Sequence, residues 1–258
     1  FSSDGAGAPG FFASSDALTG SSGVDYASWT FRKAPKFFDV VTWTGSGSAG
    51  RVIPHSLGST PGMIIIKRTD SSTNWIVYHI STGESQSLNL NLTDAKFSFT
   101  GITNVTDTSF TLSGNGSING EGDPLIAYLF AHNDGDGEFG PDSDQDIIKC
   151  GSYTGNSSKP GPSIDLGFEP QWLLVKDTTS ANDWFVWDTM RGLPSNVNNS
   201  TASLSANTSA AEVTQYGTGP TPTGFQIQDN NAAINASGHT YIYMAIRRGP
   251  LAPPEAGT

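Results

Sequence analysis

The densest group of oxygen ligands in this sequence lies in NDGDGEFGPDSDQD, residues 133–146. Carboxylates spaced along a Gly-rich loop can converge on a hard cation that takes about six to eight oxygen ligands, so the segment predicts a structural calcium site. Gln145 stands where an EF-hand loop counted from Asp134 needs a bidentate Glu, so the site would not be an EF-hand. The alternative is a solvated acidic linker. The candidate calcium ligands are Asp134, Asp136, Asp142, Asp144 and Asp146, with Glu138 among them.

A second pattern with chemical meaning is the G-x-G-x-x-G of Gly45, Gly47 and Gly50. At the start of a helix such a turn cradles a phosphate group. Here the next residues read Arg-Val-Ile-Pro, which does not begin a helix, and the matching stretch 155–161 of the internal repeat lacks the pattern. We therefore expect a flexible hairpin turn and no cofactor.

The four histidines form no recognisable catalytic or metal-binding pattern. They lack the i,i+4 pairing that binds zinc on a helix, and no G-x-S-x-G elbow supplies a nucleophile. None of them is retained at the matching position of the internal repeat, so we interpret them as ordinary surface residues. They are His55, His79, His132 and His239.

Paired carboxylates, as a glycan hydrolase would need, are also missing from the pattern. Glu121 and Asp123 are available in one copy of the repeat, but Ser237 and His239 stand at the matching positions of the other. The sequence therefore predicts no catalytic residue, and we expect the chain not to be an enzyme.

Two lysines and three aromatic residues are the remaining candidates. Lys67 and Lys176 end matching strands ahead of a turn and a Trp, and we expect them to pair with a carboxylate or to cap carbonyls, with ligand binding as the alternative. Tyr78, Trp187 and Tyr216 are candidates to stack on sugar rings, with a place in the core as the alternative.

An internal repeat organises these residues. The segment GSTPGMIIIKRTDSSTNWIVY from Gly58 aligns with GFEPQWLLVKDTTSANDWFVW from Gly167 at a constant offset of 109. Downstream, FTLSGNGSINGEGDPLIAY from Phe110 matches FQIQDNNAAINASGHTYIY from Phe225 at an offset of 115 or 116. We place an inserted loop within 201–222 to explain the change.

The start of the chain resembles the end of a module. GVDYASWTFRKAP from Gly23 matches GHTYIYMAIRRGP from Gly238 at an offset of 215. We therefore predict the end of a preceding repeat at 1–36, a first β module at 37–133, an acidic linker at 134–146, a second β module at 147–249 and a linker to further sequence at 250–258. A repeat of this length indicates modules strung in series and not a short-period solenoid.

Short runs of β-branched and aromatic residues between Gly, Pro, Asn and Ser turns predict an all-β fold. The continuous apolar runs 63–66 and 172–175 predict central strands covered on both faces. About six strands per module favour tandem β-sandwich or jelly-roll-like modules. Residues 208–215 are the one stretch expected to make a turn of helix. In the first module the predicted strands are 37–44, 62–69, 75–79, 97–100, 109–112 and 125–131.

Composition excludes several classes of protein. With 24 acidic and 13 basic side chains the net charge is -11, which argues against nucleic-acid binding because no basic face could neutralise phosphates. No apolar run approaches the roughly 20 residues that a membrane helix needs, so we expect no membrane insertion. Cys150 is the single cysteine, so no intrachain disulfide can form.

Several segments resemble a group of viral proteins. RKAPKFFDVVTWTG, IPHSLGSTPGMIIIKRTDSSTNW, DQDIIKCGSYTGN, DLGFEPQWLLVKDT, NDWFVWDTMRG and INASGHTYIYMAIRRG are similar to tandem repeats of uncharacterised structural virion proteins of marine tailed phages, especially cyanophages. The resemblance covers essentially the whole chain. It implies a virion setting, in a tail fibre or surface appendage, and supplies no functional residues.

From the repeat and this resemblance we expect a phage structural protein that serves as a spacer in a tail fibre and binds the host surface. The alternatives are a carbohydrate-binding accessory module of a glycan-degrading enzyme and a capsid decoration protein. Expected partners are further copies of the chain in a homo-oligomer, for which tail fibres suggest a trimer, together with other virion proteins and a host cell-surface glycan.

Overall fold

The computed structural model describes residues 28–193 and 200–249. It divides the chain into two units, Phe1–Arg32 and Lys33–Thr258, and every strand and helix given below belongs to the second unit. Most of the predicted end of a preceding repeat, 1–36, and nearly all of the predicted terminal linker, 250–258, lie outside the described residues. No division falls at the predicted acidic linker, 134–146.

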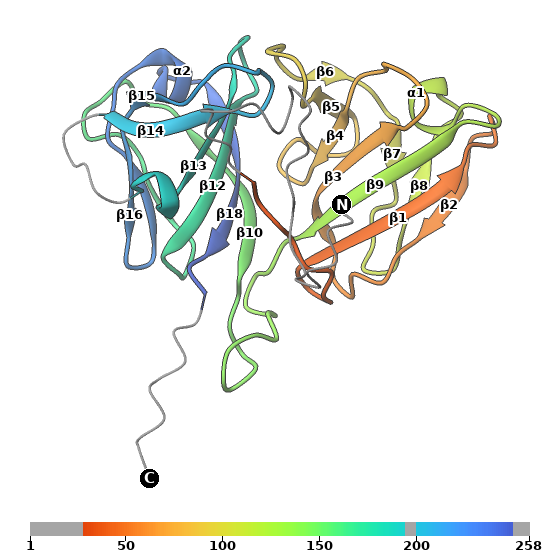
Figure 1. Ribbon diagram of the computed structural model, residues 1–258, viewed down its shortest axis with the longest axis horizontal. Helices are drawn as coiled ribbons and strands as arrows, with labels where there is room; N and C mark the ends of the chain where they lie inside the picture. Colours follow the sequence, from red (N-terminus) through yellow and green to blue (C-terminus); the bar gives the residue numbers. More distant parts are fainter. Residues whose placement is uncertain (1–27, 194–199, 250–258) are drawn as a thin grey trace, which may run out of the picture. The chain divides into compact units, whose positions relative to one another are not determined.

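The first half of the second unit, residues 37–133, contains a six-stranded and a three-stranded antiparallel sheet (Figure 1). The larger sheet has the order β1 (Phe38–Thr44), β9 (Pro124–Ala131), β3 (Pro61–Arg68), β4 (Ile76–His79), β5 (Gln86–Asn89) and β6 (Phe97–Ser98). The smaller sheet has the order β2 (Arg51–Pro54), β8 (Ser109–Leu112) and β7 (Ile102–Thr103), and the short helix α1 (Gly116–Asn119) precedes β9.

The second half, residues 147–249, contains two sheets in the equivalent order. The larger sheet runs β10 (Ile148–Thr154), β18 (Thr240–Arg247), β12 (Pro170–Asp177), β13 (Trp184–Asp188), β14 (Ser200–Ser205) and β15 (Val213–Tyr216). The smaller runs β11 (Ser163–Asp165), β17 (Gly224–Ile227) and β16 (Thr218–Thr221), with the 3-10 turn η1 (Thr189–Arg191) after β13 and α2 (Ala232–Asn235) before β18. Each strand thus has its counterpart nine strands later, which is the arrangement that a duplication predicts.

The fold is therefore an all-β sandwich, as the sequence predicted. In the second half the core lies between the larger sheet and the smaller one, and contains Val175 of β12, Trp187 of β13 and Phe225 of β17. In the first half Trp43 of β1 meets Phe110 of β8 in an edge-to-face contact, with ring centroids 6.1 Å apart. The central strands β3 and β12 are buried through their apolar runs, so the prediction that both their faces are covered is confirmed.

Two details of the sequence interpretation are wrong. Residues 208–215 form no helix, because Val213–Tyr216 pairs with β14 as a strand. The inserted loop is not within 201–222 either. Ile76 pairs with Asn89 and Phe185 pairs with Ser205, so the offset has already grown from 109 to 116 when β14 begins. The insertion lies between β13 and β14, because strand pairing keeps the remaining register fixed on either side of it.

A fully buried asparagine holds the loops at the same corner of each half. Asn119 accepts from Ser46 N at 3.0 Å, and its Nδ2 donates to Ser48 O at 2.8 Å and to Ser113 O at 3.1 Å. Asn235 makes the equivalent bonds to Asn156 N, Ser158 O and Asp229 O at 2.8–2.9 Å. Both amides are thus satisfied by backbone groups that no strand pairs, which stabilises three separate loops at once.

We expect Asn119→Ala and Asn235→Ala each to lower the free energy of unfolding by about 2–4 kcal/mol, because truncation removes three hydrogen bonds of a fully buried amide to loop backbone groups. Urea denaturation of the two variants measures the loss. Asn230→Ala, at an exposed position, is the control and should change the free energy of unfolding by less than about 0.5 kcal/mol. Equal losses in all three variants would contradict this role.

Candidate functional site

The acidic loop 134–146 is organised by backbone and lysine partners. Asp146 accepts from Gly135 N at 2.8 Å and from Gly137 N at 2.9 Å, and Asp136 accepts from Asp134 N at 3.1 Å. Lys149 Nζ lies 3.0 Å from Asp134 and keeps the pKa of that carboxyl below its usual range. These partners take up the oxygens that a cation would need.

The calcium ligands that the sequence predicts are therefore not gathered into one site. Asp142 and Asp144 are exposed on the outer part of the loop, and Lys36 Nζ lies 3.1 Å from Glu138 and 3.8 Å from Asp136. Within residues 28–193 and 200–249, no group of three or more His, Cys, Asp or Glu side chains is arranged to hold a metal ion. The loop connects β9 to β10, and Asn133 N donates to Ile148 O at 3.0 Å across its base.

The glycine pattern forms a turn, as predicted, although it joins strands of two different sheets and is not a hairpin. Gly47 and Gly50 have positive φ angles of 66° and 82°, which few other residues adopt without strain. Gly45 is required for space, because a Cβ there would lie 1.8 Å from Gly120 O. The turn therefore packs against the residues after α1 and presents no phosphate-binding helix.

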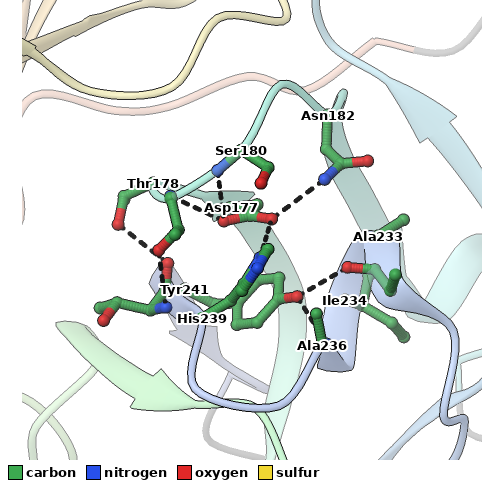
Figure 2. A network of polar contacts seen from close by, with 12 residues as sticks. Asp177, Thr178, Ser180, Asn182, Ala233, Ile234, Ala236, His239 and Tyr241 are labelled. Atoms are coloured by element: carbon green, nitrogen blue, oxygen red, sulfur yellow. Dashed lines mark hydrogen bonds and ion pairs between the residues drawn. The ribbon is translucent and has the colours of Figure 1, made fainter. Parts of the chain in front are cut away.

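A network of polar contacts lies at the end of β12, around the buried side chain of Asp177 (Figure 2). Asp177 is fully buried and accepts four hydrogen bonds. Its Oδ1 accepts from Thr179 N at 2.7 Å and from Ser180 N at 3.1 Å, and its Oδ2 accepts from Asn182 Nδ2 at 3.0 Å and lies 3.0 Å from His239 Nδ1. The carboxylate thereby fixes the β12–β13 turn to the start of β18.

Tyr241 continues this network toward α2 (Figure 2). Its hydroxyl donates to Ala232 O at 2.7 Å and accepts from Ala236 N at 2.8 Å, and burial raises its pKa to about 12. Tyr153 stacks on it with ring centroids 4.9 Å apart and donates to Ile234 O. Both hydroxyls are committed to the ends of one short helix, so neither is available as an acid or base.

In the equivalent site of the first half, the acidic residue and its basic partner exchange positions. Arg68 occupies the position of Asp177, Asp123 occupies the position of His239, and their side chains form an ion pair at 2.7 Å. A carboxylate–imidazole pair can act in catalysis when it orients a base toward a nucleophile. Here all four acceptor positions of the Asp177 carboxylate are used within the network. In the first half an Arg–Asp ion pair stands in its place, so what the two sites share is a polar link between two strands.

The two strand-ending lysines cap carbonyls, which confirms that part of the prediction. Lys67 Nζ donates to Arg68 O at 2.6 Å and to Ser71 O. Lys176 Nζ donates to Asp177 O at 2.8 Å, and to Thr93 O of the first half at 3.0 Å. Lys176 is fully buried, and desolvation lowers its pKa to about 8.

The contribution of Lys176 to the free energy of unfolding should increase between pH 8 and about pH 10. In this range the lysine has lost its proton in the folded chain but still binds one in the unfolded chain, so stability rises with pH. Cys150 acts in the opposite direction, since burial raises the pKa of its thiol. Denaturant titrations of the wild type and of Lys176→Met across this range isolate the lysine. If the unfolding free energy of the wild type minus that of the variant does not rise with pH, the prediction that burial lowers the pKa of Lys176 is wrong.

Two of the histidines are not surface residues, contrary to the prediction. His79 is 1 % exposed and His55 is 8 % exposed, and burial lowers the pKa of both. His79 Nε2 lies 3.0 Å from Tyr243 O of the second half. Its counterpart in the second half is Asp188, so the repeat pattern alone could not indicate a buried partner for it.

The three aromatic candidates for sugar stacking belong to the core. Trp187 is fully buried and Tyr78 is 5 % exposed. Tyr216 packs edge-to-face on Phe185 with ring centroids 5.0 Å apart and lies against the core of the second half. Trp187 and Tyr78 therefore present no free ring face on which a sugar could stack, and Tyr216 is partly buried against the core.

A family model described as a domain of unknown function (DUF7483) matches residues 10–250. The chain belongs to the DUF7483 family. The match runs through both halves of the DUF7483 chain and through the acidic loop between them. No curated protein and no solved structure matches it. In the part of the chain that the structure describes, no helix is long and apolar enough to cross a membrane.

Sequence reasoning missed the Asp177–His239 pair of this DUF7483 chain because the two residues lie on strands that are distant in sequence. The available signal was the comparison of Arg68 with Asp177 and of Asp123 with His239, since both positions change their charge together. Reading those two substitutions as a pair would have predicted a contact between β3 and β9, and between β12 and β18.

Proposed function

We propose that this chain is a structural, non-catalytic segment of a phage virion, placed in a tail fibre or related appendage, where it serves as a spacer. The virion setting rests on the resemblance of its repeated segments to structural proteins of marine tailed phages. The spacer role is supported by the use made of the polar residues, because the buried carboxylate, the lysines and the buried asparagines are all committed to holding strands and loops together.

The observation that carries the spacer role is the set of hydrogen bonds between the two halves. Lys176 Nζ donates to Thr93 O, Trp184 Nε1 donates to Asn89 O at 3.0 Å, and Lys96 N donates to Thr178 O at 3.1 Å. Hydrogen bonds of this kind fix the relative orientation of two sandwiches better than a flexible linker does. A chain built in this way adds length without adding a hinge between its halves.

Electron cryomicroscopy of particles purified from a culture that expresses the chain, with antibody labelling of the chain, tests this proposal. We expect the label on an appendage that projects from the particle. Label spread over the shell would overturn the proposal in favour of a capsid decoration protein. Absence of the chain from every particle, together with binding to a glycan array, would overturn it in favour of a carbohydrate-binding accessory module.

A further inference from the structure

The contact between the two halves uses a different surface on each side. Apart from His79 Nε2, which lies 3.0 Å from Tyr243 O, the first half contributes segment 89–96, which is the end of β5 and the loop after it. The second half contributes segment 176–184, which is the end of β12 and the turn into β13. Besides the three bonds given above, Asn182 N donates to Thr93 O at 2.9 Å. Because the two surfaces differ, the contact is heterologous and can be continued by further copies.

Because the chain is repeated, the second half has a segment equivalent to 89–96 and the first half has a segment equivalent to 176–184. These two equivalent segments take no part in the hydrogen bonds between the halves. In the second half the counterpart of segment 89–96 is segment 205–212, and in the first half the counterpart of segment 176–184 is segment 67–75.

Both counterpart segments have the backbone geometry of the engaged ones. Leu92 N donates to Asn89 O at 3.3 Å, and Thr208 N donates to Ser205 O at 3.2 Å, so the loop after β5 and the loop after β14 begin with the same turn. Trp75 N donates to Asn91 Oδ1 at 2.9 Å, and Trp184 N donates to Asn207 Oδ1 at 2.8 Å. Segments 205–212 and 67–75 are therefore already shaped for the contact.

The counterpart segments are more exposed than the engaged ones. Trp184 and Lys176 are buried at the contact, whereas Trp75 and Lys67 are only half-buried. Leu88 is fully buried, whereas its counterpart Leu204 is half-buried, and residues 208–212 are all exposed. Lys67 Nζ donates to Ser71 O of its own loop, whereas Lys176 Nζ donates to Thr93 O of the other half.

Charge favours pairing of the two unengaged segments. In the contact between the halves, Lys96 N donates to the carbonyl of the residue after Asp177. The counterparts of Lys96 and Asp177 are Glu212 and Arg68, so the same contact made between two chains would bring a carboxylate close to a guanidinium. A net charge of -11 opposes association of whole chains, which makes the contact weak at low ionic strength.

We propose that a second copy of this chain docks its segment 205–212 on segment 67–75, and so repeats between chains the head-to-tail contact that joins the two halves within a chain. In this contact Ser209 O takes the place of Thr93 O as the acceptor for Lys67, and Glu212 lies beside Arg68. The proposal does not rest on a virion setting, since it follows from contacts within the chain.

Charge reversal tests the contact in the full chain. Sedimentation equilibrium over a concentration series at about 0.15 M salt should show association of the wild type. Arg68→Glu and Glu212→Arg should each weaken association about tenfold or more, because each places like charges across the contact. An equimolar mixture of the two variants should restore it, since every contact between unlike chains then pairs opposite charges.

Matched controls separate this contact from a change in net charge or in folding. Lys159→Glu and Glu121→Arg alter exposed charges outside both segments and should associate as the wild type does. Thermal melting identifies any loss of fold, because Arg68 pairs with Asp123 and Glu212 pairs with Arg191 within one chain. Restored association in the equimolar mixture can come only from folded variants. A wild type that stays monomeric at millimolar concentration, or a mixture that associates no better than its components, would overturn the proposal.

Discussion

Asp177→Ala should lower the free energy of unfolding by about 3–5 kcal/mol, the range found when one partner of a buried charged network is removed. The variant leaves Thr179 N, Ser180 N and Asn182 Nδ2 without their acceptor in a site that excludes water. It also removes the link to His239 at the start of β18. Chemical denaturation followed by tryptophan fluorescence measures the loss, and Trp184 lies close enough in sequence to report on the site.

Asp165→Ala provides the matched control for this prediction. Asp165 also accepts a backbone N–H, from Gly167 at 3.1 Å, but it is exposed, so its loss should cost less than about 1 kcal/mol. Asp177→Asn should fall between the two, because the amide keeps one acceptor oxygen but presents a donor to Asn182. If Asp177→Ala were no more destabilising than Asp165→Ala, the network would not hold the turn.

Acidification should weaken the fold through His79 by about 3 kcal/mol between pH 6.5 and pH 4. Its Nε2 donates to Tyr243 O and its Nδ1 accepts from Ser81 N at 3.1 Å, so the ring is neutral and has no room for a second proton. Burial lowers its pKa to about 4. The unfolded chain therefore binds a proton first, and the stability that is present above pH 6.5 is lost as the pH falls through this window.

The wild type and His79→Gln distinguish this contribution from those of the carboxylates, since glutamine can still donate to Tyr243 O and does not titrate. The difference between their unfolding free energies should shrink by about 3 kcal/mol as the pH falls from 6.5 to 4. His55 and His132, whose pKa values burial also lowers, titrate in the same range and remain in both proteins. A difference that does not change with pH would show that His79 becomes protonated without cost.

The strands that the sequence predicted are those with strong β-branched or aromatic runs. The segments 37–44, 62–69 and 125–131 match β1, β3 and β9 to within a residue at each end. The strands β2 and β5 were missed because they are short and contain Arg and Pro, or Gln and Asn, instead of a run of β-branched or aromatic residues. The strand β7 was missed because it has only two residues, Ile102 and Thr103. Pairing with neighbouring strands decides their conformation, and that information is not local.

The helices α1 and α2 were missed for a related reason. Each has four residues and begins after an asparagine whose side chain accepts from the second helical N–H, Asn115 for α1 and Asn231 for α2. An Asn before so short a stretch gives no periodic apolar pattern. The buried Asn119 and Asn235 were visible as a repeated residue, but their role depends on loops brought together by both sheets.

The candidate site was the least predictable part, because the acidic residues that stand together in sequence bind Lys149, Lys36 and backbone N–H groups, which are partners that their spacing does not reveal. The contacts between halves were also hidden, since a tandem repeat by itself predicts modules in series. Lys176 and Trp184 differ little in local sequence from Lys67 and Trp75, and only the presence of a neighbouring half separates their environments.

The charge-reversed pairs restrict how this gene can change by recombination between its own two halves. A crossover after β3 that joined it to β18 would place Arg68 beside His239, and the reciprocal product would place Asp177 beside Asp123. The first combination has no carboxylate, and the second brings two carboxylates together at a largely buried site. A crossover between β3 and β9 that shortens the chain by one repeat should therefore cost folding stability, whereas one before β3 keeps each pair intact.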